Sequence, residues 1–393
     1  MIGPMLTPGT FTWGEAVPVV LVAILVLFVP GGVSVLTARG RPLTALALGP
    51  AITVTEITAG GVLASLAGVR WGAVPFLLTA VAGWLVAGVL GCPVPSRHRR
   101  RPTPHDAAAV EAKAEAEASS VQPPADGGRR WEVAAGGLGV LAAFAVVATV
   151  MTLSEEVPTL FPQHPDTIFH LGLAQWMVGS GDISILHSDG FAYPGRGTGG
   201  YPVGFHDVTA TLTMLTGVPV VVATSCAVLV MAGLVWPLGM LALGRSVLGR
   251  NPAVCLLAPF VAVLFTAYPY MIMGFGVLWP NLLGQALLPG VLAVTMPFPA
   301  WIQARRVPPG GLGLSMLLLL AALPGLTMAH PNATITWLLF ATIALVIALL
   351  RALPRARAAG GRSVVLTVAA AVLVVLPLAY VGSLQVGSMV KTG

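Results

Sequence analysis

The sequence has few charged residues and few cysteines. Lys, Arg, Asp and Glu together make up 9% of its 393 residues, whereas 56% are hydrophobic and the mean hydropathy is +0.89. A soluble domain carries about 25% charged residues, so this composition excludes an ordinary soluble globule and predicts a multi-pass membrane protein. Cys92 falls at the edge of an apolar run and Cys226 and Cys255 fall within such runs, which indicates neither a disulfide framework nor a metal–thiolate site.

Long apolar runs account for most of the chain. Because a helix needs about 20 residues to cross the hydrocarbon core, we predict an all-α membrane protein, a polytopic helical bundle of about ten transmembrane helices. Glu15 and no basic residue precede the first run, so it is expected to be an anchor rather than a cleavable signal peptide. The predicted spans lie near residues 17–36, 43–66, 74–90, 133–153, 218–243, 253–273, 282–302, 312–329, 333–350 and 364–384.

Basic residues are confined almost entirely to one side of these predicted spans. With the N-terminus outside, 17 of the 20 Lys and Arg residues fall in inner loops, and only Arg70, Arg196 and Lys391 fall outside. Because basic loops stay cytoplasmic, the protein is predicted to lie in the cell membrane with both termini external. The net charge of +6 then follows from topology and indicates no nucleic-acid partner.

A charged linker separates two predicted membrane units. Residues 1–92 are predicted to form a three-span N-terminal unit, residues 93–131 a cytoplasmic linker, and residues 132–393 a seven-span core. The basic cluster at residues 97–101 is expected to contact anionic membrane lipids. A solvated run of charge is the alternative.

One external segment, residues 154–207, holds six of the 14 acidic residues and four of the seven histidines. A short helix is predicted from Pro165 to Gly179, because proline favours the first helical turn. On that helix Asp166 and His170 are four residues apart and share a face, which is typical of an acid/base or metal-binding pair. Alternatively, Asp166 only complements the helix dipole and His170 only covers a lipid-facing surface.

A metal site is left open by the sequence. Two ligands four residues apart are a weak metal signature without a third, although Asp182, His187 and Asp189 follow closely. We therefore assign no metal ligands and no certain cofactor, and keep a divalent metal as an alternative.

The end of the external segment is rich in glycine and carries one basic residue. Arg196 is a planar, bidentate donor suited to phosphate or carboxylate, so the segment resembles a lid; an ordinary loop with a solvated arginine is the alternative. Pro202 is expected to open a second helix that places His206 and Asp207 just inside the outer interface.

Two further external turns carry polar side chains at membrane depth, where such groups are costly unless paired or functional. Trp279 and Asn281 belong to a Trp-Pro-Asn turn, and His330 and Asn332 to a His-Pro-Asn turn, on the same side as the acidic segment. Proline and asparagine can serve simply as turn and capping residues, but a turn does not require the imidazole of His330.

Glu56 is the one acidic residue deep inside a predicted span. An intramembrane carboxyl group is a functional candidate by default. A protonated carboxyl hydrogen-bonded to Thr53, Thr55 or a neighbouring helix is the alternative.

These motifs resemble those of known membrane proteins. Asp166 at the start of a short external helix, followed by the stretch from Tyr201 to His206, resembles the first external loop of lipid-linked-sugar glycosyltransferases of the GT-C fold. The Tyr-Pro stretch and the turns at 279–281 and 330–332 are also similar to a family of multi-pass actinobacterial membrane proteins, over residues 133–384. The likeness to GT-C enzymes lies in the architecture and the loop, so it is an analogy about function.

The resemblance implies an enzyme that transfers a sugar from a polyprenyl phosphate to an acceptor of the envelope glycan, with inversion at the anomeric carbon. It implies that Asp166 is the general base, with His170 beside it, and that cationic or hydrogen-bonding groups stabilise the departing phosphate. The candidate substrate-binding residues are Arg196, Tyr201, His206, Asp207, Trp279, Asn281, His330 and Asn332.

The chain also departs from the GT-C pattern. Three spans precede the core, and no external carbohydrate-binding domain follows the last span before Gly393, so either the acceptor is bound without such a domain or the sequence is a fragment. Two alternatives come from other classes: a transporter or lipid flippase that uses Glu56, and a non-catalytic membrane scaffold of the envelope machinery.

Overall fold

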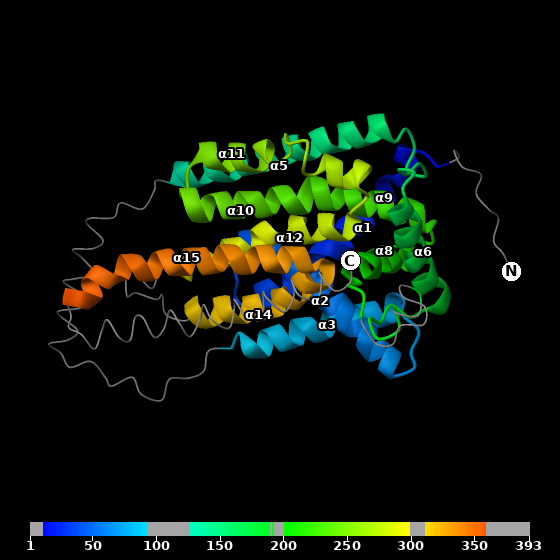
Figure 1. The fold of residues 1–393 in the computed structure, drawn as a ribbon, viewed down its shortest axis with the longest axis horizontal. Helices are drawn as coiled ribbons and strands as arrows, with labels where there is room; N and C mark the ends of the chain where they lie inside the picture. Colours follow the sequence, from blue (N-terminus) through cyan, green and yellow to red (C-terminus); the bar gives the residue numbers. More distant parts are fainter. Residues whose placement is uncertain (1–10, 93–125, 189–190, 192–199, 299–310, 359–393) are drawn as a thin grey trace.

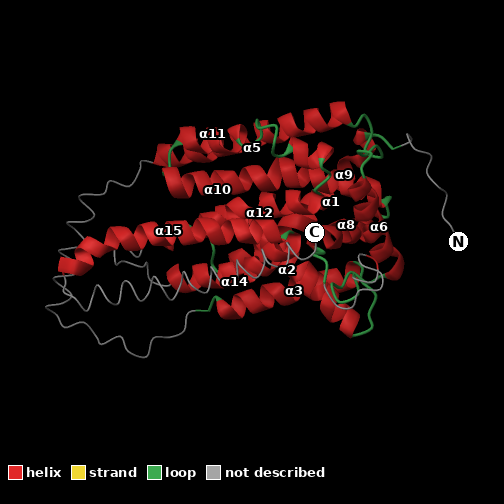
Figure 2. Ribbon diagram, in the orientation of Figure 1, coloured by secondary structure: helices red, strands yellow, loops and turns green. Residues whose placement is uncertain are grey.

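The structure is a computed structural model that describes residues 11–92, 126–188, 191, 200–298 and 311–358. All regular elements in these ranges are helices, two of them π-helices, and no strand occurs there (Figure 2). The elements are α1 (Trp13–Thr37), α2 (Pro42–Leu66), α3 (Ala73–Leu90), α5 (Asp126–Ser154), α6 (Pro165–Ser180), α8 (Gly204–Thr216), α9 (Val220–Val230), η1 (Met231–Val235), α10 (Trp236–Leu248), α11 (Pro252–Val261), η2 (Met271–Phe275), α12 (Trp279–Thr295), α14 (Gly311–Ala329) and α15 (Pro331–Ala358).

Local sequence signals set several helix ends. Thr12 and Glu15 form a capping box at the start of α1, in which each side chain accepts a hydrogen bond from the other residue's backbone N–H. Gly181 follows α6 with φ of 70° and Gly217 follows α8 with φ of 73°. Both glycines adopt the left-handed conformation that ends a helix at little steric cost.

Six described helices are long and apolar enough to cross a membrane, which agrees with an all-α membrane bundle. They span Trp13–Thr37, Pro42–Leu66, Ala73–Leu90, Gly128–Ser154, Val220–Leu248 and Pro331–Arg351, and two shorter apolar helices span Pro252–Val261 and Gly313–Ala329. The structure therefore supports a helical membrane bundle, but it does not establish the ten predicted spans. The predicted span at 364–384 and most of the predicted linker at 93–131 lie outside the described residues.

The predicted span at residues 253–273 is not one helix. Helix α11 ends at Val261, turns follow, and the short π-helix η2 begins only at Met271. Pro269 disfavours a helix in the last part of this stretch, because proline lacks the N–H that a helix needs and moves the preceding residue, Tyr268, out of the helical region. It does not account for the end of α11 at Val261. The next predicted span is shorter than expected, since α12 ends at Thr295.

Helix α2 lies at the centre of the bundle (Figure 1). Buried residues make up 72% of the 18-residue apolar stretch of α2, against 11% of the corresponding stretch of α3 and 17% of that of α15. Glycines let the neighbouring helices approach its backbone: a Cβ atom on Gly31 of α1, Gly290 of α12 or Gly325 of α14 would collide with an α2 carbonyl oxygen. The predicted N-terminal unit and the predicted core therefore share one hydrophobic core.

Helices α6 and α8 lie at one end of the bundle, next to the end of α5 and the start of α9 (Figure 1). Arg39 and Arg41, between α1 and α2, and Arg245 and Arg250, between α10 and α11, lie at the opposite end. Arg70 is on the α6 side, where its guanidinium donates to the Gly179 carbonyl oxygen at 3.0 Å. This distribution among the described residues is the one that the sequence predicts.

Candidate functional site

Helix α6 forms where the sequence predicts it and begins with a histidine cap. Pro165 occupies the first turn, and His164 Nδ1 accepts a hydrogen bond from the backbone N–H of Asp166 at 3.3 Å. The Asp166 side chain is 47% exposed, and its Oδ2 lies 3.5 Å from the same His164 nitrogen. The Asp166 carboxylate is therefore accessible from outside the protein at this end of the bundle.

His170, one turn further along α6, faces the bundle. It is buried, and its Nδ1 lies 3.1 Å from Nε2 of His206 on α8. Since one nitrogen of such a pair must donate and the other must accept, one ring supplies the proton of this hydrogen bond. The structure thus brings together His170 and His206, two of the predicted site residues, and buries His170 within the protein instead of leaving it on a lipid-facing surface.

Burial keeps both imidazoles neutral. It lowers the pKa of His170 to about 4, an effect opposed by the charge of Asp166 and reinforced by His330. It lowers the pKa of His206 well below the usual value, with His170 adding to the effect. His206 Nδ1 has no hydrogen-bond partner among the described residues. A neutral pair of this kind can accept and pass on a proton.

Aromatic rings enclose the histidine pair. The ring centroid of Tyr201 lies 5.6 Å from that of His206, and the centroid of Trp279 lies 6.1 Å from that of His170. Phe169 and Phe205 complete the enclosure, with centroids 5.4 Å and 6.2 Å from His170. The structure thus brings Tyr201 and Trp279 to the predicted site.

His330 and Asn332 repeat the arrangement at the start of α6. His330 Nδ1 accepts the backbone N–H of Asn332 at 3.2 Å, and Pro331 opens α15. The triplets at 164–166 and 330–332 are therefore two His-Pro-Asx caps. In each, Nδ1 accepts, so a neutral ring carries its proton on Nε2 and can donate it to a ligand. Burial lowers the pKa of His330, which favours this neutral form.

The structure corrects the predicted turn at 279–281. Trp279 opens α12, so Pro280 and Asn281 lie in its first turn rather than in a loop. Proline is common in the first turn of a helix, so the Trp-Pro-Asn sequence is compatible with a helix start as well as with the predicted turn. The Trp279 indole N–H donates to the Met273 carbonyl oxygen at 3.1 Å, and Asn281 Oδ1 is buried without a partner among the described residues.

Asp207 makes its contact with the bundle interior. It is fully buried, and Thr58 of α2 donates to its Oδ2 at 2.7 Å, while Oδ1 has no partner among the described residues. Burial raises the pKa of Asp207 well above the usual value; the Thr58 hydrogen bond opposes this effect and the charge of Asp182 adds to it. Asp207 therefore connects α8 with α2 and does not share the hydrogen bond of the histidine pair.

Arg196, the predicted phosphate-binding residue, lies outside the described residues, as does Asp189. Glu155, just after α5, has a buried Oε2 without a partner in the described part of the chain, and burial raises its pKa to about 7.

A second polar cluster joins α2 to the chain after α6; Asp182 and His187 are adjacent to the predicted site in sequence, but their contact with Ser65 is not predicted. His187 Nδ1 lies 2.6 Å from Asp182 Oδ2 and 3.1 Å from Ser65 Oγ, and Ser65 also donates to Asp182 at 3.0 Å. Because one nitrogen makes both contacts, the trio is not arranged as a nucleophile–base–acid relay. The separation of 117 residues between Ser65 and Asp182 explains why spacing alone gave no signal.

Metal ligands do not gather in the described ranges. No group of three or more His, Cys, Asp or Glu side chains there is close enough to hold a metal ion. The divalent metal that the sequence analysis left open has no ligand set in this part of the chain.

Comparison with known proteins gives a family for the chain. A model for a family of unknown function (DUF6541) matches residues 24–391. The chain belongs to this family. No curated protein and no solved structure matches it at a significant level.

Proposed function

We propose that this member of the family is a GT-C-like inverting glycosyltransferase that acts at the external face of the cell membrane. It takes a sugar from a polyprenyl phosphate and transfers it to an acceptor of the envelope glycan. One observation carries the proposal: Asp166, the His170–His206 pair and the distant His330 gather at the end of the bundle that holds few of the described basic residues.

The proposed reaction is a single displacement. The acceptor hydroxyl attacks the anomeric carbon, its proton passes to the Asp166 carboxylate, and the bond from that carbon to the phosphate oxygen breaks. The phosphate leaves with the bonding electrons, so donors must stabilise it. The Nε2–H groups of His164 and His330 are suited to this role, and Arg196 is proposed to join them.

The buried pair His170–His206 is proposed to act behind Asp166. Its rings are neutral and hydrogen-bonded to each other, and the aromatic rings of Tyr201 and Trp279 limit the access of water. Exclusion of water strengthens electrostatic interactions in the site and limits hydrolysis of the donor. Asp166 remains the group that touches the acceptor.

Native mass spectrometry of the protein, purified in mild detergent from an actinobacterial host, tests the donor. We expect a co-purifying polyprenyl-phosphate sugar in the wild type, and at least a tenfold loss of it in Arg196→Ala, in line with the removal of a charged hydrogen bond of about 1.5–3 kcal/mol. Arg70→Ala is the matched control, because Arg70 lies on the same side but binds the Gly179 carbonyl oxygen. A bound lipid without a sugar, or equal occupancy in all three proteins, would contradict the proposal.

An alternative function rests on a different observation. Glu56 lies inside α2 beside a cavity, with one carboxyl oxygen free of partners in the described structure. This favours a transporter or lipid flippase in which Glu56 binds a proton or the substrate. Loss of transport activity on Glu56→Gln, with glycosyl transfer absent from the wild type, would support that alternative.

A further inference from the structure

Four arginines lie at one corner of the bundle, where the start of α5, the end of α10 and the start of α11 meet at the end opposite α6 (Figure 1). Arg129 and Arg130 belong to the beginning of α5, Arg245 to the last turn of α10 and Arg250 to the loop before α11. The sequence predicts that this end is cytoplasmic. The arginine cluster, formed by these four residues, is separate from the histidine cluster at the opposite end.

One carboxylate holds two of these arginines. Glu132 Oε2 accepts a hydrogen bond from Arg245 Nη2 at 3.1 Å and lies 3.4 Å from Arg250 Nε. Arg245 also donates to Cys255 Sγ at 3.6 Å, and its side chain is 16% exposed, whereas that of Arg250 is 58% exposed. A guanidinium carries five N–H donors, so one carboxylate oxygen cannot satisfy two of them. Arg250 is thus fixed by Glu132 and still presents donors to the outside.

The arginines of α5 add positive charge beside this group. Arg129 lies three residues before Glu132, so the two share one side of the helix. Arg129 and Arg130 are exposed, and neither forms an ion pair with a described residue. The stretches 126–132 and 245–250 together hold four arginines and two acidic residues. The corner therefore keeps an excess of two positive charges, which attracts an anion.

Exposed apolar side chains place the arginine cluster at the depth of lipid headgroups. Val133 directly follows Glu132, Leu248 lies two residues before Arg250, and both are exposed. Trp131 is 70% exposed, and tryptophan is enriched where the membrane meets water. Along α5 the exposed apolar surface continues to Leu138, about 9 Å from Glu132. A phosphate at the arginines would therefore have acyl chains beside an apolar helix surface.

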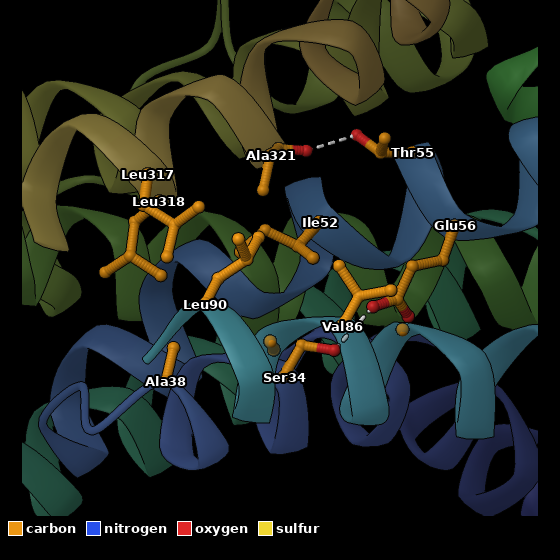
Figure 3. A pocket seen from close by; sticks show the side chains of 12 residues that line it. Ser34, Ala38, Ile52, Thr55, Glu56, Val86, Leu90, Leu317, Leu318 and Ala321 are labelled. Carbon is orange, nitrogen blue, oxygen red and sulfur yellow. Dashed lines mark hydrogen bonds between the residues drawn. The ribbon is translucent and has the colours of Figure 1, made fainter. Parts of the chain in front are cut away.

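We propose that the arginine cluster binds the headgroup of an anionic phospholipid of the cytoplasmic leaflet, with its phosphate against Arg250 and Arg129 and its acyl chains along α5. Arginine suits phosphate because its planar guanidinium can donate two parallel hydrogen bonds, and this leaflet is the one rich in anionic lipid. The site does not depend on the glycosyltransferase proposal. It is also separate from the cavity beside Glu56, which lies between α1, α2, α3 and α14 (Figure 3).

Fluorescence quenching beside the cluster tests the site. In a Cys92→Ser background, Leu138→Cys carries a fluorophore, since the other two cysteines are buried. The protein is reconstituted into phosphatidylcholine vesicles that contain phosphatidylglycerol or phosphatidylcholine with a nitroxide on the acyl chain. Quenching gives the relative binding constant of the two lipids at the reporter. We expect phosphatidylglycerol to be favoured about 25-fold, because each of two exposed arginines contributes about fivefold.

Charge-matched variants locate the effect. Arg250→Gln and Arg129→Gln should each lower the preference to about fivefold, and the double variant should show none. Both side chains are exposed, so the fold should persist. Arg351→Gln on α15, which is exposed and removes the same charge from another helix, should keep the full preference.

Three results would overturn the proposal. The first is equal quenching by the two nitroxide lipids in the protein with all four arginines. The second is a preference that the double variant retains, which would assign it to other basic residues. The third is a preference abolished by inorganic phosphate, which would indicate a site for a free anion and not for a lipid.

Discussion

His170 and His206 are two imidazoles that share one hydrogen bond inside a largely apolar enclosure. Burial lowers the pKa of both side chains, so each ring is neutral at pH 7. Protonation of either ring is unfavourable only in the folded protein, because the unfolded chain exposes both rings to water. The pair therefore ties the stability of this end of the bundle to pH.

Folding should weaken as the pH falls. A histidine whose pKa is lowered on folding contributes stability that is present above its usual pKa of 6.5 and is lost as the pH falls toward about 4. For His170 alone the loss is about 3 kcal/mol over that window. Thermal unfolding in detergent at pH 7.5 and 4.5 measures it, and His170→Gln should show a smaller drop in Tm than the wild type. Equal drops in both proteins would contradict the account.

At the scale of elements, α2 is held by close contacts between backbones. Its carbonyl oxygens of Ala47 and Ala51 meet Gly290 of α12 and Gly325 of α14, and no side chain fits between them. Such close approach of backbones packs membrane helices together, and between α2 and α14 the Thr55 hydroxyl adds hydrogen bonds to the Ala321 carbonyl oxygen and the Gly325 N–H. The same central helix carries Thr58, which holds Asp207 of α8, so the packing of α2 also positions the helix that bears His206.

Gly290→Ala should destabilise the protein. Its Cβ would collide with the Ala47 carbonyl oxygen, and overpacking of this kind costs about 1–3 kcal/mol. Gly137→Ala on α5 is the matched control, since no neighbouring atom lies near its Cβ position, and it should raise stability by about 0.5–1 kcal/mol through helix propensity. Thermal unfolding of both variants at one pH makes the comparison; a Gly290→Ala protein as stable as the wild type would contradict the role of this contact.

Some parts of this arrangement can be predicted from the sequence because they depend only on local signals. Helix α6 follows from local signals at Pro165 and Gly181, and the i to i+4 relation of Asp166 and His170 needs only helical geometry. The sequence places His170 and His206 in the same external segment, but it does not predict their direct contact, because that contact depends on how α6 packs against α8. The cap by His164 is not among the predictions, although the His-Pro-Asx triplet occurs twice and could have indicated it. The break after Val261 was also missed, since hydropathy hides a turn whose residues are apolar.

On the scale of the whole molecule, charge sets one end of the bundle apart from the other. Described arginines between α1 and α2 and between α10 and α11 lie opposite α6, where the Asp and His side chains gather. Basic loops stay on the cytoplasmic side, so the histidine cluster is expected to face outward. An outward site suits a donor and an acceptor that are both attached to the envelope.

Cysteine labelling in intact cells tests this orientation. In a Cys92→Ser background, a membrane-impermeant maleimide should label His187→Cys, which is exposed near α6, and should leave Ser246→Cys, at the opposite end, unlabelled until the cells are broken. The two buried native cysteines should not react. The reverse pattern would place the cluster in the cytoplasm and contradict an external reaction.

The most direct measurement of the central claim is sugar transfer by Asp166→Asn in reconstituted vesicles supplied with a polyprenyl-phosphate sugar. We expect transfer to fall by about 10²–10⁴-fold, the usual contribution of a general base, while the variant stays folded and keeps the donor bound. Asp182→Asn, a nearby carboxylate that is engaged by His187 and Ser65, should keep wild-type transfer. Full transfer by Asp166→Asn would remove Asp166 as the base and direct attention to Glu155 or Glu156.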